Sequence, residues 1–228
     1  MTPTVISIQG RATFSKVAER AALLVDISDT DPEKNLVSSN VVSTVNTLQS
    51  KIDALCPRLP NNDISPDAPV SFYSIATLST SSEDEYDGES TKTGRKLFTA
   101  RTTLDVHFRD FKKLSDMVVH LSTLPFVHLQ GITWKLTDET KAKLGEEARL
   151  EALRNAIKRA NAYAGVIGRE KVTPVKIEDE QEYFMLGMAK QTEHMTSGAA
   201  VFGLGVGIDF EPQLIEVSAT VNVEFHAE

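Results

Sequence analysis

Hydrophobic and polar residues alternate most regularly near the end of the chain, from Leu214 to Phe225. The apolar positions are every second residue: Ile215, Val217, Ala219, Val221, Val223 and Phe225. Such alternation predicts a strand with one buried and one solvent-exposed face, which is typical of an antiparallel sheet covered on one side. Weaker signals predict further strands at residues 5–9, 17–27, 70–78, 98–108, 127–136 and 172–177. A turn is expected at Gly10, between the first two.

A long amphipathic helix is predicted near residues 138–165. Thr137 is a suitable N-cap, and Gly165 suits the left-handed residue just past a helix end. The apolar face is mostly alanine: Leu150, Ala152, Leu153, Ala156, Ile157, Ala160, Tyr163 and Ala164. Because alanine is small, the helix should approach its support closely, as it would on a sheet. Gly145 costs about 1 kcal/mol relative to alanine and is expected to interrupt or kink the first turns.

Two shorter helices complete the predicted elements. One starts at Asp31-Pro32-Glu33 and ends at Cys56-Pro57, and the other covers Phe111 to Leu121. The elements do not alternate regularly between strand and helix. This order favours an α+β fold with antiparallel or mixed sheets covered on one face by helices. We expect residues 1–228 to form a single domain or two intimately packed halves, because a helix–strand rhythm repeats along the chain.

Two stretches are predicted as flexible loops. Residues 79–94 are polar and acidic, and residues 178–211 are rich in methionine and glycine. The second stretch contains apolar residues that are either tucked against the core or exposed for a partner, and the sequence favours neither alternative. They form the candidate interaction segment: Tyr183, Phe184, Met185, Leu186, Met188, Val201 and Phe202.

Composition narrows the class of protein. Of the 228 residues, 41% are hydrophobic and 25% are charged, as in an ordinary globular protein. The formal net charge of −8 argues against a general nucleic-acid binder, which needs clustered lysine and arginine. No apolar run is long enough to span a bilayer, and the start of the chain lacks the pattern of a secretory signal. A single cysteine, Cys56, fits a reducing compartment, so the chain is expected to be cytoplasmic.

The residues that could carry chemistry do not form a recognisable set. Gly203, Gly205 and Gly207 lack the spacing of a dinucleotide-binding loop, so a flexible loop is favoured. Cys56 precedes a proline at a helix end, with no visible base to activate it, so a small and partly buried residue is favoured over a nucleophile. The five histidines lack paired metal-ligand spacing: His107, His120, His128, His194 and His226.

An acidic cluster lies within the first predicted loop. Its members are Glu83, Asp84, Glu85, Asp87 and Glu89. They could bind a divalent cation, but the fixed ligand spacing of a calcium loop is absent, so a solvated acidic loop is favoured. We therefore predict no catalytic, cofactor-binding or metal-binding residues.

Five segments resemble parts of the SIMPL-domain family, in the family's order. They are Val5–Gly10, Phe98–Asp110, Gly131–Asp138, the helix from Glu147 to Gly165, and Glu211–Phe225. The family includes bacterial periplasmic antigens and an animal protein that associates with a Pelle-like kinase. The resemblance implies an α+β fold and, as in some bacterial members, ring-like or channel-like homo-oligomers. It supplies no agreed catalytic residues.

These observations lead to an expected function. We expect a non-enzymatic interaction or scaffold protein that self-associates, with no cofactor. The resemblance alone adds a protein partner in kinase-associated signalling. The alternative is a small-ligand-binding protein or a hydrolase with a pocket between two halves. A pocket with converging polar groups around His107 or His128 would favour that alternative.

Overall fold

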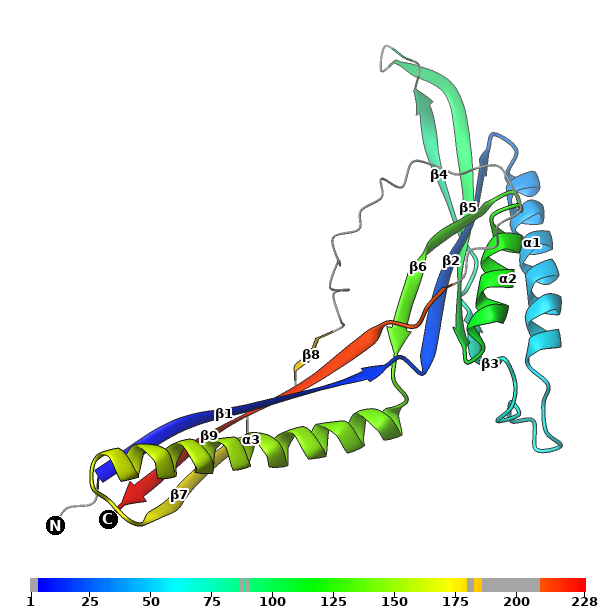
Figure 1. Cartoon of the computed structure of the whole chain (residues 1–228). Coiled ribbons are helices and arrows are strands. Elements are labelled where there is room, and N and C mark those ends of the chain that lie inside the picture. Colours follow the sequence, from blue (N-terminus) through cyan, green and yellow to red (C-terminus); the bar gives the residue numbers. More distant parts are fainter. Residues whose placement is uncertain (1–3, 87, 89–90, 180–182, 186–209) are drawn as a thin grey trace, which may run out of the picture. The chain divides into compact units, whose positions relative to one another are not determined.

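The computed structural model describes residues 4–86, 88, 91–179, 183–185 and 210–228 (Figure 1). The chain divides into two compact units. The first unit is formed by the described parts of Met1–Ala18, Leu136–Ser197 and Gln213–Glu228. The second unit is formed by the described parts of Glu19–Lys135 and Gly198–Pro212. Antiparallel sheets and helices occur in both units, so the α+β prediction is confirmed.

The sheet of the first unit is built on the last strand of the chain. Strand β9 (Leu214–Ala227) lies between β1 (Thr4–Val17) and β7 (Val172–Asp179), all antiparallel. The pairing of β1 with β9 runs without a register shift from Thr4 opposite Ala227 to Val17 opposite Leu214. A short strand, β8 (Tyr183–Met185), also pairs with β9, opposite Ser218 to Glu216. The alternation seen in the sequence therefore belongs to the central strand of this sheet.

One long helix, α3 (Asp138–Val166), covers one face of this sheet. Its N-cap is Thr137, as predicted: the Thr137 hydroxyl accepts a hydrogen bond from the backbone N–H of Thr140 at 3.3 Å. Gly145 is buried and the helix continues through it, so the predicted interruption is wrong. The left-handed residue is Gly168 (φ 70°) rather than Gly165. The backbone N–H of Arg169 bonds back to the carbonyl of Ala164 at 2.9 Å, which completes a Schellman motif one turn later than expected.

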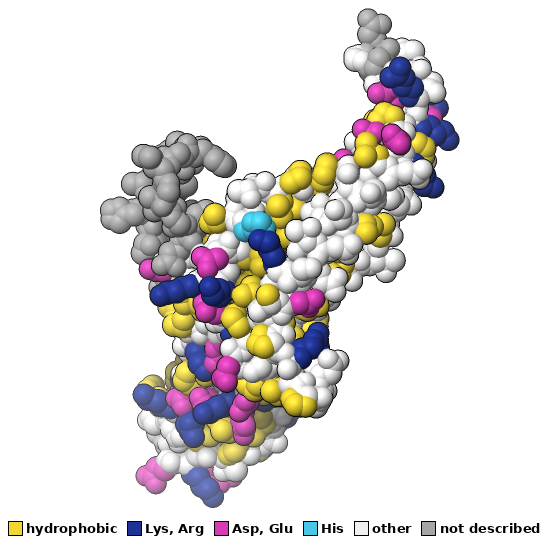
Figure 2. Space-filling view, turned by 90° about the vertical axis from the view of Figure 1, so that its right-hand side faces the viewer, with side chains coloured by type: hydrophobic (Ala, Val, Ile, Leu, Met, Phe, Trp, Pro, Cys, Tyr) yellow, Lys and Arg dark blue, Asp and Glu magenta, His cyan; other side chains and the backbone are white. Residues whose placement is uncertain are grey.

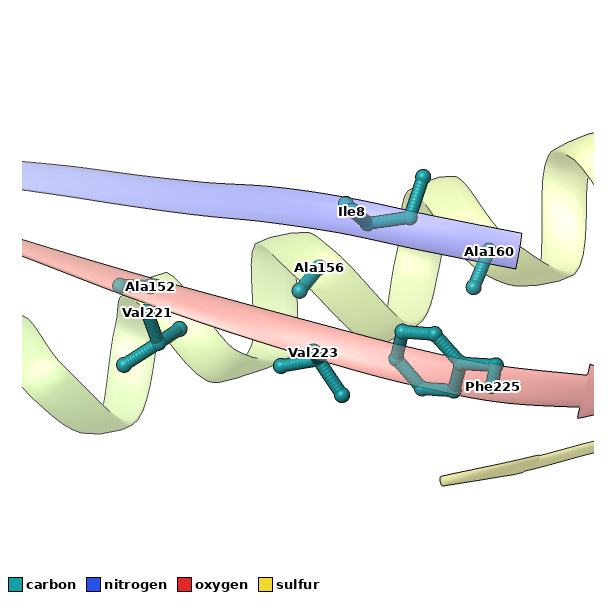
Figure 3. Close-up of a cluster of buried hydrophobic side chains, with 7 residues drawn as sticks. All are labelled: Ile8, Ala152, Ala156, Ala160, Val221, Val223 and Phe225. Atoms are coloured by element: carbon teal, nitrogen blue, oxygen red, sulfur yellow. The ribbon is translucent and has the colours of Figure 1, made fainter. Parts of the chain in front are cut away.

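Small side chains let α3 lie close to the sheet. Figure 3 shows Ala152, Ala156 and Ala160 beside Ile8 of β1 and the β9 side chains Val221, Val223 and Phe225. Gly10 is essential to this contact, because a Cβ atom at that position would lie 2.1 Å from the carbonyl oxygen of Ala152. Gly10 is therefore a site of helix–sheet contact and not the predicted turn. Strand β1 continues through it to Val17.

The second unit contains the larger sheet. Its strand order is β3 (Val70–Ile75), β5 (Lys92–Phe108), β2 (Arg20–Asp31) and β6 (Val127–Lys135). The helices α1 (Lys34–Leu55) and α2 (Phe111–Leu121) lie on one face of it (Figure 1). They bury large aliphatic side chains there: Val37, Val41, Leu48, Ile52, Leu114 and Leu121. Leu23, Val25 and Ile27 of β2 are buried too.

The predicted loop at residues 79–94 contains a strand. Strand β4 (Ser79–Tyr86) pairs with β5 from Ser79 opposite Arg101 to Tyr86 opposite Lys92. The prediction of a loop over the whole stretch is therefore wrong. Strand β4 is mostly exposed on both faces, so it has none of the apolar alternation that marks a strand packed on a core.

Candidate functional site

Strand β1 lies at the edge of its sheet. Its strand partner is β9, and no other described strand pairs with β1 on the side away from β9, which we call the outer edge. The backbone N–H of Ala18 bonds to Gln213 on the β9 side at 2.8 Å, whereas the carbonyl of Gln9 accepts from the Arg159 guanidinium at 2.7 Å. Since backbone groups alternate between the two sides of an antiparallel strand, Ser7, Gln9 and Arg11 direct theirs to the outer edge.

The two faces of β1 differ in chemistry. Ser7, Gln9, Arg11, Thr13 and Ser15 are exposed on the face without the helix. On the helix face, Ile6, Ala12 and Phe14 are only half-buried. The outer edge therefore combines available backbone groups with apolar side chains that α3 does not cover completely.

One side of α3 stands beside this edge. It can be identified by two contacts: Arg159 reaches Gln9 of β1, whereas Arg149, on the other side, lies 4.0 Å from Asp179 of β7. At 100° per residue, the residues on the Arg159 side form what we call the α3 flank. They are Leu144, Glu151, Asn155 and Arg159.

The face of the first sheet without the helix carries a shallow polar hollow of about 220 Å³. Its polar lining comes from three strands: Ser7, Gln9, Lys176, Glu178, Asn222 and Glu224. Lys176 and Glu178 form an ion pair at 2.7 Å, and the hydrogen bond with Glu178 raises the pKa of Lys176. These charges are already paired, so the hollow offers no concentrated charge of one sign to a ligand.

A second polar cluster lies on the helix-free face of the other sheet. The Nε2 atom of His107 lies 3.2 Å from an Asp105 carboxylate oxygen and 3.4 Å from the Lys135 amine. The ring of Phe72 contacts the imidazole, with centroids 5.0 Å apart. In a nucleophile–base–acid triad, the two ring nitrogens contact different partners. Asp105 and Lys135 both contact Nε2 of His107, so among the described residues the cluster is not arranged as a triad.

Sequence reasoning missed one buried ion pair. Asp26 of β2 is 5% exposed, and the Arg101 Nε atom lies 2.5 Å from its carboxylate. In the sequence, the only sign of this ion pair is that Asp26 interrupts the apolar run of β2. The partner on β5 depends on strand register and could not be read from the sequence. This pair satisfies a buried charge on a sheet face, which is a structural role.

The acidic cluster of the β4–β5 hairpin is partly neutralised. Lys92 bonds to Asp84 at 2.6 Å, and this contact lowers the pKa of Asp84. In Figure 2 basic and acidic side chains lie side by side near the tip of this hairpin, at the top of the view. The described residues contain no group of three or more histidine, cysteine, aspartate or glutamate side chains that could hold a metal ion. Asp87 and Glu89 lie outside the described residues.

The other predicted residues are dispersed. In the candidate interaction segment, Tyr183, Phe184 and Met185 form β8, whereas Leu186, Met188, Val201 and Phe202 lie outside the described residues. His194 and the glycines at positions 203, 205 and 207 also lie outside the described residues. Cys56 is buried, and burial raises the pKa of its thiol, which disfavours the nucleophilic thiolate.

The remaining histidines do not converge with His107. His120 lies in the last turn of α2, and its buried Nε2 atom has no hydrogen-bond partner within the part of the chain that the structure describes. His128 is opposite Asp26 on the edge strand β6, and His226 is opposite Val5 in the other unit. The structure therefore brings His107 together with Asp105 and Lys135, and leaves the other described histidines apart.

Comparison with known proteins identifies one family. The family model described as SIMPL, protein of unknown function (DUF541), matches residues 6–225. No curated protein matches the chain. None of the described helices is both long enough and apolar enough to cross a membrane.

Proposed function

Because the chain belongs to the SIMPL family, whose function is unknown, we propose that it is a non-enzymatic interaction protein that self-associates through the outer edge of β1. The observation that carries this proposal is the strand order, which leaves β1 with β9 as its described strand partner. An unpaired strand edge is a template for another strand, because its N–H and C=O groups lack partners in the sheet. A second copy of the chain carries the same edge, so the two copies can pair edge to edge.

The shape of this edge favours pairing. Proteins protect edge strands with prolines, β-bulges or very short strands. Strand β1 has 14 residues, contains no proline, and pairs with β9 without a bulge. The edge is thus long and regular, and both properties favour the addition of a strand.

Chemical features of the surface agree with an interaction role. Leu144 and Phe14 are half-buried beside the edge. A partner that covers these side chains removes apolar surface from water, at about 25 cal/mol per Å². Association with a kinase, which rests on the resemblance alone, stays a prediction without a described surface.

The test is the molar mass in solution as a function of protein concentration. Size-exclusion chromatography with light scattering is expected to show a dimer or larger oligomer that dissociates on dilution. Replacing Ser7 by proline removes a backbone N–H from the outer edge while leaving the bonds to β9 in place, so association should weaken at least about tenfold. The matched control, Ser7→Val, keeps the N–H and should associate like the parent chain.

Two outcomes would contradict the proposal. A monomer at every concentration up to the millimolar range would exclude self-association. Equal association of Ser7→Pro and Ser7→Val, with unchanged melting temperatures, would show that the contact lies elsewhere.

A further inference from the structure

We infer that two copies of the chain pair their β1 strands antiparallel about a two-fold axis at Gly10, which packs the two α3 flanks together with Asn155 on the axis. This inference rests on the proposed function and specifies its interface. It joins the two first-unit sheets into one continuous sheet that carries a pair of antiparallel helices on one face.

The sequence of β1 selects the centre of pairing. With Gly10 opposite its own copy, Gln9 faces Arg11 of the second copy and Ser7 faces Thr13, so no like charges meet. On the helix face, the half-buried Ile6 and Phe14 lie opposite each other and cover one another. A centre at Arg11 instead would place two arginines face to face. Charge therefore excludes a centre at Arg11 and is compatible with the Gly10 centre.

The α3 flank is complementary to itself when reversed. About a centre at Asn155, Glu151 of one copy faces Arg159 of the other, and this acid–base contact occurs twice. The spacing of these residues is the same in both directions from Asn155, as a two-fold interface requires.

The two centres coincide in space. A Cβ atom on Gly10 would touch the carbonyl oxygen of Ala152 and the Cβ atom of Ala156, so the middle of α3 lies over Gly10. A two-fold axis perpendicular to the sheet reverses every direction in its plane, and the two helices must then run antiparallel. With strands roughly 4.8 Å apart and α3 lying over β1 and β9, the helix axes come to roughly 10 Å, the usual packing distance.

Existing contacts at the edge are compatible with this arrangement. The carbonyl of Gln9 accepts one hydrogen bond from Arg159, and a carbonyl oxygen has two lone pairs. It can therefore also accept the backbone N–H of Arg11 from the second copy. Glu151 pairs with Arg154 at 3.0 Å within its own helix, and this exposed contact can be shared or exchanged at little cost.

A charge-swap experiment tests the register. Glu151→Arg alone, and Arg159→Glu alone, each place like charges together twice per interface and should raise the dissociation constant at least about tenfold. The double variant restores both pairs in reverse and should recover association to within about threefold of the parent chain. The matched control is Glu146→Arg, the same charge change on the opposite side of α3, which should leave association unchanged.

A cross-linking experiment tests the axis. Only residues close to a two-fold axis form a disulfide with their own copy, because the Cβ atoms must come within about 4.5 Å. Asn155→Cys should therefore give a covalent dimer under mild oxidation, seen on a non-reducing gel. Glu146→Cys should remain a single chain. The native Cys56 is buried and should not contribute, as the parent chain will show.

The outcomes separate this inference from the proposal on which it rests. A parent chain that stays monomeric overturns both. A parent chain that associates, with no cross-link at position 155 and no response to charge reversal, overturns the two-fold register and leaves self-association standing. A cross-link together with rescue in the double variant establishes the register.

Discussion

The two units use the same layer arrangement with different side chains. Each unit has an antiparallel sheet with its helices on one face. In the second unit α1 and α2 bury leucine, isoleucine and valine, whereas in the first unit α3 presents alanines. Among the largest fully buried side chains, Phe225 alone belongs to the first unit, and the others belong to the second. The second unit is therefore stabilised mainly by its own apolar core, and the first depends on the close approach of helix and sheet.

This difference explains where an interaction surface is expected. A close alanine contact buries little apolar area per residue. Burial of further apolar surface at a sheet edge therefore adds proportionally more to the stability of the first unit than to that of the second. The second unit already encloses its large residues. Figure 2, which faces the α1 side, shows few charged side chains over that helix.

The largest loss in the free energy of unfolding is expected from a substitution in the core of the second unit. Leu23→Ala removes a side chain that is 1% exposed and leaves a cavity, at a cost of about 4 kcal/mol. Urea unfolding should be followed through the fluorescence of Trp134, the single tryptophan, which packs on Phe111 in the same unit. Exposed Leu24→Ala is the matched control and should cost less than about 1 kcal/mol. Equal losses for both variants would refute a core on that face.

Adding a side chain under α3 in the first unit should lower the free energy of unfolding by a slightly smaller amount. Gly10→Ala forces a Cβ atom against the Ala152 carbonyl, so α3 must shift, and the cost should be about 3 kcal/mol. Amide hydrogen exchange in α3 reports this loss locally. A Cβ atom at Gly165 meets no atom within 4 Å, and Gly165→Ala should be neutral or stabilising by up to about 1 kcal/mol. A harmless Gly10→Ala would show that the helix does not depend on close approach.

A smaller effect is expected at the buried ion pair of the second unit. Arg101→Met leaves the Asp26 carboxylate buried without its cation. Because the Arg101 side chain is 56% exposed, the cost should be about 1–2 kcal/mol rather than the larger value of a fully buried pair. Thermal unfolding measures it. The double variant Asp26→Leu/Arg101→Met should recover most of the loss, and a failure to recover would assign Arg101 another role.

The smallest effects are expected at the helix caps, one in each unit. Asp110 accepts hydrogen bonds from the backbone N–H groups of Lys112 and Lys113 at 2.9 and 3.2 Å. Thr137 accepts a longer hydrogen bond from the backbone N–H of Thr140, at 3.3 Å. Replacement by alanine should therefore cost about 1 kcal/mol at Asp110 and about 0.5 kcal/mol at Thr137. Chemical denaturation of the two variants gives the order, and the reverse order would contradict this reading of the caps.

Much of the fold could be predicted because the relevant signals are local. The alternation of β9 and the alanine face of α3 depend on residues close together in the chain, and the alanines are buried as expected. Leu150, Ile157 and Tyr163, which were predicted on the same face, are exposed. The boundary between β1 and β2 was wrong because Gly10 resembles a turn residue. Only the helix above it, 140 residues later in the chain, reveals its use. Strand β4 was missed because cross-strand pairs such as Lys92 with Asp84 hold it in place of a core.

The candidate interface could not be predicted for a related reason. Whether a strand is central or at an edge depends on the order of strands, which no local pattern of β1 records. The charged side of α3 is visible in the sequence as an ordinary solvated face. Only the structure shows that this side of α3 lies beside the edge of β1, because Arg159 donates a hydrogen bond to the carbonyl of Gln9.

The pairing of β1 with β9 also has a consequence for folding during synthesis. Thr4 lies opposite Ala227, so the first unit contains strands from both ends of the chain. Strands β2 to β6, by contrast, come from the continuous stretch Glu19–Lys135. A ribosome therefore releases nearly everything the second unit needs well before β9 exists, and domains generally fold as units while they are synthesised. We therefore expect β1 to remain without its strand partner in the nascent chain until β9 has been synthesised.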